Sequence, residues 1–320
     1  CSDSIASEDK VLPSVRPTRM SVRVASHAGS WYAGRGDELK KQLDRWLQDV
    51  KKSDELQPSC GLIAPHAGYS YSGPTAAYAY RYMDPSRIKR IFVLGPSHHY
   101  YLTGCALSKH SAYATPLGNL EIDTDVVKEL HSSGLFEYMS EEVDEDEHSL
   151  EMQMPYIYKV MEQASKSYKI VPVLVGNLSP KKEDVYGSLF SRYLNDPSTF
   201  FVISSDFCHW GSRFRYTYYD PSFGEIYQSI EALDRQGMQE IESLSPENFQ
   251  NYQAKFNNTI CGRHPIAVLL NALKASSAAS QASVQSLYKI QFVRYAQSSP
   301  CRCQADSSVS YASAVVKTAG

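Results

Sequence analysis

The sequence predicts a single α/β domain with a central, largely parallel sheet flanked by helices. Two observations lead to this expectation: apolar runs of strand length alternate with helical patterns, and the runs "KIVPVLVG" (169–176) and "TFFVISS" (199–205) are almost entirely apolar. Strands covered on both faces read as near-continuous apolar runs, and strand–helix alternation indicates a parallel sheet. Because the composition does not break along the chain, we expect one domain over residues 21–318.

The individual elements follow from the period of the apolar residues. Short apolar runs predict strands at 60–64, 90–94, 170–175, 199–204, 284–296 and 307–316. Longer segments with helical periodicity predict helices at 37–50, 74–82, 123–132, 148–163, 181–195, 223–238 and 259–275. Pro155 falls inside one of these helices and is expected to kink it, because proline lacks the N–H and clashes with the preceding turn.

Composition and charge exclude several classes of function. The chain has 320 residues, 42% of them apolar, and a net charge of -3 with a pI near 6.3. This balance does not favour a nucleic-acid partner. No apolar run approaches the roughly 20 residues that a membrane-spanning helix needs, so membrane insertion is not expected.

The cysteines and the N-terminal segment bear on the compartment. Seven cysteines are scattered along the chain, and residues 1–20 are polar with no apolar signal region. An odd number of cysteines without a secretion signal indicates free thiols in a reducing compartment, so we expect a cytoplasmic or nuclear protein. Residues 1–20 are expected to be a disordered extension.

Polar side chains follow three of the predicted strands. His66 comes after the run at 60–64, His98 and His99 come after 90–94, and Asp206 and His209 come after 199–204. Ligands of open α/β sheets bind beyond the carboxyl ends of the strands. If these strands are parallel neighbours, their polar ends converge on one site; the alternative is that they are unrelated loop residues.

A group of imidazoles and a carboxylate has three chemical uses. It can hold a divalent metal, since neutral imidazole is a common metal ligand. It can act as a general acid or base near neutral pH. It can bind an anion when the imidazoles are protonated. The large sequence separations match no short metal-binding signature, so the sequence pattern leaves these uses open.

Three further segments could contribute to such a site. Cys261 is expected at the start of a helix, where the thiol pKa is lowered, although a small buried hydrophobic role is equally expected. His148 follows an acidic run and shares a helix face with Glu151, but acidic residues at a helix start are usually solvated, so His148 is not expected to bind a metal directly. Trp31 could line the pocket or pack in the core, and Arg213 lies among aromatics that could grip an aromatic anion.

Several long motifs resemble one known family. They occur in order along the chain as "SHAGSWY", "APHAGYSYSG", "KRIFVLGPSHH", "DEDEHSLEM", "VPVLVG", "SSDFCHWG" and "NTICGRHPI". The sequence resembles the Memo family, a mediator of receptor tyrosine kinase-driven cell motility, from about Ser21 to Val316. The resemblance implies a fold like that of the class III non-haem extradiol dioxygenases.

The resemblance also implies roles for particular residues. His66 and His98 stand where the dioxygenases hold iron, Cys261 stands where they have a carboxylate, and His209 matches their catalytic base. Asp206 is adjacent by motif and is assigned to the catalytic group. A thiolate makes the site softer, which favours copper over iron or zinc and argues against ring-cleaving dioxygenase activity.

Two classes of function therefore remain. The first is a redox-linked protein that binds copper, with iron or zinc as alternatives, through His66, His98 and Cys261 and supports receptor tyrosine kinase signalling and cell motility. The second is a phosphotyrosine-binding adaptor without catalytic activity. Its expected partners are phosphorylated receptor tails or signalling adaptors, and its pocket residues are Trp31, His66, His209, Arg213 and Cys261.

Overall fold

A sheet with four parallel strands at its centre organises the molecule. The computed structural model describes residues 21–164 and 167–318. The central strands, in spatial order, are β2 (Ser59–Ala64), β9 (Thr199–Ser204), β3 (Arg90–Pro96) and β8 (Lys169–Val175). All three pairings between them are parallel. Every residue from Ile91 to Pro96 and from Thr199 to Ser204 is buried, as expected for strands covered on both faces.

Antiparallel pairs extend this sheet on both sides, so the complete sheet is mixed. Beyond β2 and β8 lie β12 (Ser308–Thr318), β11 (Tyr288–Gln297), β10 (His209–Trp210), β4 (Cys105–Leu107) and β7 (Phe136–Tyr138). Strand β12 runs antiparallel to β2, and β4 runs antiparallel to β8. A separate three-stranded sheet is formed by β1 (Val22–Arg23), β5 (Ala112–Thr115) and β6 (Gly118–Glu121).

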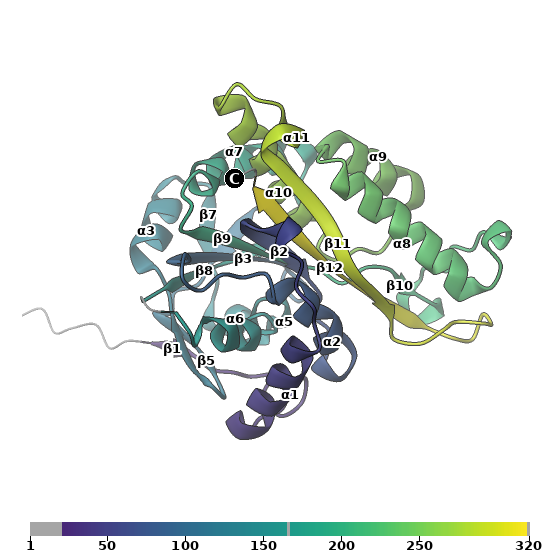
Figure 1. Cartoon of the computed structure of the whole chain (residues 1–320), viewed down its shortest axis with the longest axis horizontal. Coiled ribbons are helices and arrows are strands. Elements are labelled where there is room, and N and C mark those ends of the chain that lie inside the picture. Colours follow the sequence, from purple (N-terminus) through teal and green to yellow (C-terminus); the bar gives the residue numbers. More distant parts are fainter. Residues whose placement is uncertain (1–20, 165–166, 319–320) are drawn as a thin grey trace, which may run out of the picture.

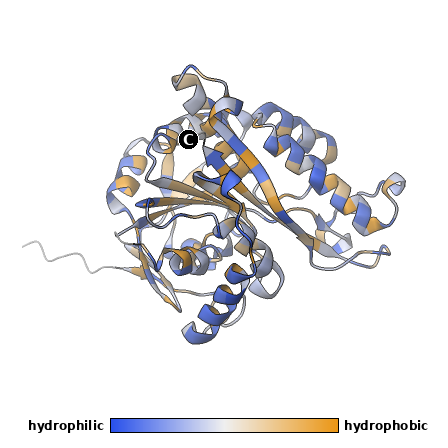
Figure 2. Cartoon of the chain, in the orientation of Figure 1, coloured by the Kyte–Doolittle hydropathy of each residue, from blue (hydrophilic) through white to orange (hydrophobic). Residues whose placement is uncertain are grey.

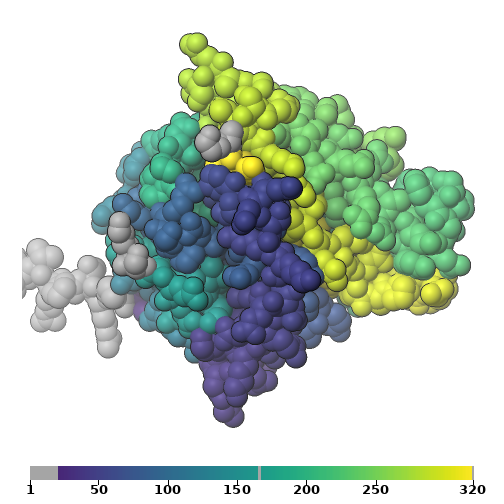
Figure 3. All heavy atoms as spheres, viewed as in Figure 1, coloured from purple at the N-terminus to yellow at the C-terminus, as the bar shows by residue number. Residues whose placement is uncertain are grey.

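Helices cover both faces of the central sheet (Figure 1). In chain order they are α1 (Gly36–Gln48), α2 (Tyr69–Tyr80), α3 (Thr124–Ser132), α4 (Glu141–Asp146), α5 (His148–Glu151), α6 (Met154–Met161), α7 (Pro180–Leu194), α8 (Ile226–Glu242), α9 (Pro246–Phe256), α10 (Arg263–Ala279) and α11 (Val284–Leu287). Figure 1 shows α7 and α10 above the sheet and α1, α2, α5 and α6 below it. The space-filling view in Figure 3 shows α8 and α9, in green, beside the yellow C-terminal strands at one side of the molecule.

The predicted α/β class is confirmed, and the strands predicted at 60–64, 90–94, 170–175, 199–204 and 307–316 are all present within one or two residues. Residues 284–287 form a helical turn instead of a strand. The prediction for residues 1–20 lies outside the described residues. The apolar side chains of the strands and inner helix faces merge into one main hydrophobic core, visible as orange ribbon at the centre of Figure 2.

Two predicted helices differ from the structure in an informative way. The helix expected from 74 begins at Tyr69, and Pro74 is accommodated inside it. Proline removes only the hydrogen bond to the carbonyl of Ser70, which is exposed and can be solvated. The helix expected at 148–163 is broken into α5 and α6, with the break at Met152–Gln153 just before Pro155.

Among the helices within residues 21–164 and 167–318, none is both long enough and apolar enough to cross a membrane. The cysteines outside the first twenty residues are all free thiols, as the sequence indicated.

We predict that Gly187→Ala destabilises the protein at the contact between α7 and α10. A Cβ at Gly187 would lie 2.8 Å from the Asn271 carbonyl carbon, too close without moving one helix. Overpacking of this kind costs about 1–3 kcal/mol of unfolding free energy, measurable by urea titration. Ser188→Ala, one residue along and exposed, is the control and should change the unfolding free energy by no more than about 0.5 kcal/mol.

Candidate metal and ligand site

The parallel register brings three strand ends to one edge of the sheet. Ala64 of β2 pairs with Ser204 of β9, and Leu94 of β3 pairs with Ile203. The residues just beyond these pairs are His66, Asp206 and His98, so the register places them side by side. The predicted convergence of polar strand ends is confirmed for these residues.

Hydrogen bonds determine which nitrogen of His66 is free. Ser204 Oγ donates its only proton to the Ser149 carbonyl at 2.7 Å and accepts from Gln153 Nε2 at 2.9 Å. The third contact of this hydroxyl, 2.7 Å to His66 Nδ1, must therefore be donated by the imidazole. His66 is consequently the Nδ1–H tautomer, and its Nε2 lone pair faces Cys261 Sγ at 3.2 Å.

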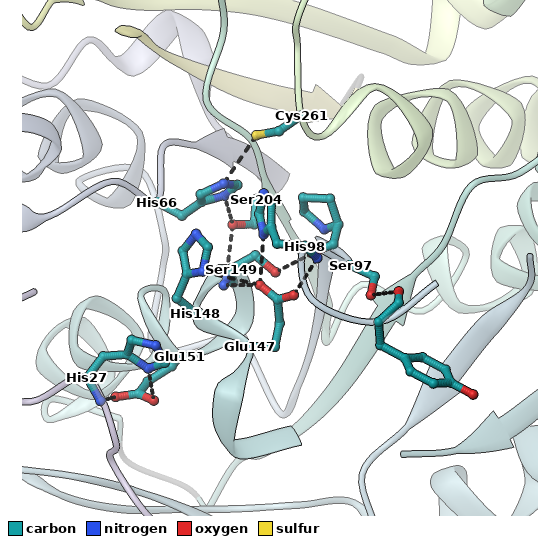
Figure 4. Close-up of polar contacts among 12 residues, drawn as sticks. His27, His66, Ser97, His98, Glu147, His148, Ser149, Glu151, Ser204 and Cys261 are labelled. Atoms are coloured by element: carbon teal, nitrogen blue, oxygen red, sulfur yellow. Dashed lines mark hydrogen bonds and ion pairs between the residues drawn. The ribbon is translucent and has the colours of Figure 1, made fainter. Parts of the chain in front are cut away.

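His66 and Cys261 meet His98 in a compact group of three metal-ligand side chains. One potential ligand atom from each lies within 4.8 Å of the others. Figure 4 shows the Cys261 thiol reaching His66 from the segment before α10, with His98 nearby. Burial lowers the pKa of His66 far below its usual value, and the neighbouring His98 adds to that effect. A neutral imidazole and a thiol in contact are suited to a metal ion.

The expected lowering of the Cys261 pKa is wrong. Burial raises the pKa of this thiol, and the hydrogen bond with His98 only partly opposes the rise. Helix α10 begins at Arg263 and has Gly262 as its N-cap, so Cys261 lies before the first helical turn. Loss of solvation therefore outweighs the helix terminus, and the thiol needs His98 or a cation to ionise.

Glu147 orients His98. Its two carboxylate oxygens accept from the His98 backbone N–H at 2.7 Å and from His98 Nδ1 at 2.9 Å. Burial lowers the pKa of His98, but hydrogen bonds to Cys261 and Glu147 outweigh it and raise the pKa to about 10. Because Nδ1 is held by Glu147, the other ring nitrogen of His98 is left for the site.

His148 is part of the same imidazole cluster. Its ring stacks on His98 with centroids 4.4 Å apart and lies 4.4 Å from the Trp31 ring. Burial, together with His66 and His98, lowers the pKa of His148 to about 3. His98, Glu147 and His148 form a second group of potential ligands within 4.8 Å, so the sequence prediction that His148 is not a direct ligand stays a prediction.

The acidic run before His148 is solvated only at Glu141, Glu142 and Asp146, with Glu145 half-buried, which corrects part of the sequence interpretation. Asp144, Glu147 and Glu151 are all at most 2% exposed. Glu151 accepts from Arg23 Nη1 at 2.5 Å, from Tyr32 at 2.7 Å and from His27 Nδ1 at 2.9 Å. Sequence reasoning missed these buried carboxylates, because Arg23 lies more than a hundred residues from Asp144 and Glu151, and His98 lies 49 residues from Glu147.

Asp206 and His209 follow strand β9, and Asp206 contacts two of the three potential metal ligands. Asp206 Oδ1 accepts from the His66 backbone N–H at 2.9 Å, and the Asp206 N–H faces Cys261 Sγ at 3.2 Å. Burial raises the pKa of the Asp206 carboxyl. His209 Nδ1 lies 2.9 Å from the Phe207 carbonyl, which fixes its Nδ1–H tautomer and leaves Nε2 free to accept a proton. This geometry is compatible with the predicted base.

Trp31 and Arg213 are both exposed side chains. Trp31 is 37% exposed and packs on His148, so it is not a core residue. Arg213 is exposed on the short 3-10 helix at Ser212–Phe214, and its guanidinium lies over the Phe214 ring at 4.4 Å. The Phe214 ring in turn meets His209 edge-on, with centroids 5.2 Å apart.

The site motifs and the whole chain match one protein family. A family model described as Memo-like protein matches residues 23–315, which is most of the chain. The chain belongs to the Memo family. Curated relatives in this family include Protein MEMO1 of Rattus norvegicus, which is 55% identical over 294 residues. That similarity covers 92% of this Memo protein and 97% of the relative.

More distant proteins match with lower identity. Protein memo-1 homolog of Caenorhabditis elegans is 46% identical over 295 residues, covering 92% of this Memo protein and 82% of the relative. A solved structure, the uncharacterized protein JW3007 from Escherichia coli K12, matches with a TM-score of 0.47 at 10% identity. The match covers 79% of this chain and 99% of that one.

We predict that Glu151→Gln lowers the unfolding free energy at neutral pH and makes that free energy less sensitive to acid. Burial alone would raise the pKa of Glu151, but the hydrogen bond from His27 and the charge of Arg23 lower it from 4.5 to about 2. Because the folded pKa is the lower one, this stabilisation is full above pH 4.5 and is lost as the pH falls toward 2. The shift corresponds to about 3 kcal/mol of unfolding free energy.

Urea unfolding of wild type and Glu151→Gln across this pH range measures the effect. Glu142→Gln, which removes an exposed carboxylate of α4, serves as the matched control and should follow the wild type. If wild type and Glu151→Gln lose stability in parallel as the pH falls, Glu151 is not the titrating group.

Proposed function

We propose that this Memo protein binds copper through His66, His98 and Cys261 and works as a redox-linked protein in receptor tyrosine kinase signalling and cell motility. The observation that supports it is the approach of His66 Nε2 and Cys261 Sγ to 3.2 Å, with a His98 nitrogen completing a group within 4.8 Å. Iron and zinc are the alternatives for the same donors. The signalling role rests on membership of the Memo family.

The chemistry of the donor set favours copper over iron. Thiolate and imidazole are soft or intermediate ligands and select Cu(I) or zinc, whereas iron dioxygenases need a hard carboxylate. Two carboxylates lie close to these donors. Glu147 is engaged by His98 Nδ1 at 2.9 Å, and Asp206 has its Oδ1 taken by the His66 backbone N–H, with its Oδ2 3.9 Å from His66 Nε2. Ring-cleaving dioxygenase activity is therefore not part of the proposal.

The surrounding hydrogen bonds prepare these donors for a metal. Ser204 holds the His66 tautomer and Glu147 holds the His98 ring, and such supporting contacts typically change metal affinity by about 10–100-fold. Copper bound here would supply a one-electron redox centre. In this proposal His209, whose Nδ1–H is donated to backbone carbonyls, would hold or release a proton at Nε2.

A second candidate function is phosphotyrosine recognition in a protein without catalytic activity. A specific observation supports it: the exposed Arg213 lies on Phe214, which packs against His209. A guanidinium recognises phosphate through paired hydrogen bonds, and the exposed Trp31 ring offers an aromatic surface. Phosphorylated receptor tails or signalling adaptors are the partners in this proposal, with Trp31, His66, His209, Arg213 and Cys261 as pocket residues.

The copper proposal predicts that Cys261→Ser weakens Cu(I) binding by roughly 100-fold or more, because the only soft ligand is removed. His66→Ala should weaken binding as well, since one of two imidazoles is lost. Affinity should fall as the pH drops, because the thiol and imidazoles must lose protons to bind metal. Titration against a competing Cu(I) chelator under anaerobic conditions measures each affinity.

Cys303→Ser is the matched control for this experiment. Cys303 is an exposed free thiol outside the histidine cluster, so its loss should leave the high-affinity binding unchanged. Tight Cu(I) binding by Cys261→Ser at the wild-type level would exclude the thiolate site and leave the phosphotyrosine proposal.

The phosphotyrosine proposal predicts peptide binding that persists in metal-free protein. Arg213→Ala should lower the affinity for a phosphotyrosine peptide by about tenfold, as expected for the loss of one charge-assisted hydrogen bond. Trp31→Ala should weaken it further through lost stacking. Fluorescence anisotropy with the phosphorylated and unphosphorylated forms of one peptide measures this, with Arg87→Ala as a control for an exposed arginine before β3. Equal binding of the two peptide forms would contradict the proposal.

A further inference from the structure

A second cavity lies apart from the histidine cluster, between α9, the start of α10 and the segment that leads into α7. Its volume is about 420 Å³, within the range of small-molecule sites. Its apolar wall includes Leu178, Pro180, Pro246, Phe249 and Ala267. It shares no lining residue with the His66–His98–Cys261 group.

Three side-chain atoms of two residues that line this cavity lack a hydrogen-bond partner within the described residues. Both amide atoms of Gln253, Nε2 and Oε1, are buried and have no hydrogen-bond partner among the described residues. Asn258 is 3% exposed, and its Oδ1 is likewise without a partner in the described part of the chain. Buried polar atoms are rarely left unpaired, so a set of three at one cavity points to a ligand.

The remaining lining residues define the charge that the cavity can take. Glu183 is occupied by His264, whose Nδ1 lies 2.6 Å from its carboxylate, and Asn177 Oδ1 lies 2.9 Å from His264 Nε2. Arg263 is exposed at the cavity and supplies a cation. The cavity thus combines an apolar wall, an adjacent donor and acceptor on Gln253, and one positive group.

We propose that this cavity binds a small anionic molecule that carries an amide edge, meaning neighbouring N–H and C=O groups, on an apolar or planar body. The amide edge pairs with both atoms of Gln253, a further N–H reaches Asn258 Oδ1, and the anion pairs with Arg263. N-acylated amino acids and pyrimidine nucleotides share this chemistry. The proposal is independent of the copper and phosphotyrosine proposals, because it uses none of their residues.

Titration of the 15N-labelled full chain with N-acetylphenylalanine and, separately, with uridine 5′-monophosphate tests the proposal by NMR. At least one probe should bind with a dissociation constant of about 0.5 mM or below, as expected for molecules of this size. Binding should shift the Gln253 side-chain amide resonances, which are identified by their loss in Gln253→Leu. The probe that binds identifies the source of the ligand.

Two variants and one control locate the binding. Gln253→Leu and Arg263→Ala should each lower the affinity for the probe by about tenfold or more, and Arg87→Ala should leave it unchanged. Without ligand, Gln253→Leu should have a melting temperature equal to or above that of wild type, because it removes two unpaired buried polar atoms. That readout separates loss of recognition from loss of folding.

Several results would overturn the proposal. One is failure of both probes to bind at about 10 mM, which is well above the expected dissociation constant. Another is binding that is unaffected by both cavity variants. Equal affinity for 3-phenylpropionate, which lacks the amide, would show that the Gln253 edge is not recognised.

Discussion

The parallel register of β2, β9 and β3 is the constraint on which the site depends. It aligns Ala64 with Ser204 and Leu94 with Ile203, so the residues two positions beyond the end of each strand meet at one edge of the sheet. A slip of one residue would turn every side chain of a strand to the other face. Because these strands are buried on both faces, their apolar packing resists such a slip and keeps the site in place.

Ser204 and Glu147 connect neighbouring backbone segments and orient the imidazole rings of the site. Ser204 joins the end of β9 to α5 through the Ser149 carbonyl and determines the His66 tautomer. Glu147 joins α5 to the segment after β3 and determines the orientation of His98. The donor atoms of His66 and His98 are therefore held in place by Ser204 and Glu147, which are not among the three proposed ligands.

The burial of acidic groups explains how one end of the sheet can hold so many imidazoles. Glu151 is compensated by Arg23, Tyr32 and His27, and Glu147 is compensated by His98. Burial opposes ionisation of Glu147, but the bonds from His98 lower its pKa to about 2. Such groups stay charged only while every partner is present, so the network favours a single arrangement of α5 against β3.

The sequence by itself determined the α/β class, the central strands, the polar strand ends and, through its motifs, the Memo family. The class, the strands and the polar strand ends can be predicted because they depend on the spacing of apolar residues and on the positions that follow each strand, and both rules hold for any parallel sheet. The convergence of His66 and His98 was within reach for the same reason, whereas Cys261 was assigned to their group only through the family resemblance. Only the tertiary structure decided that Asp144, Glu147 and Glu151 are buried, because their partners Arg23 and His98 are distant in sequence. It also decided that burial raises the pKa of Cys261, since desolvation depends on every element packed around a group. The separate cavity lined by Gln253 likewise exists only where α9, α10 and the segment before α7 come together.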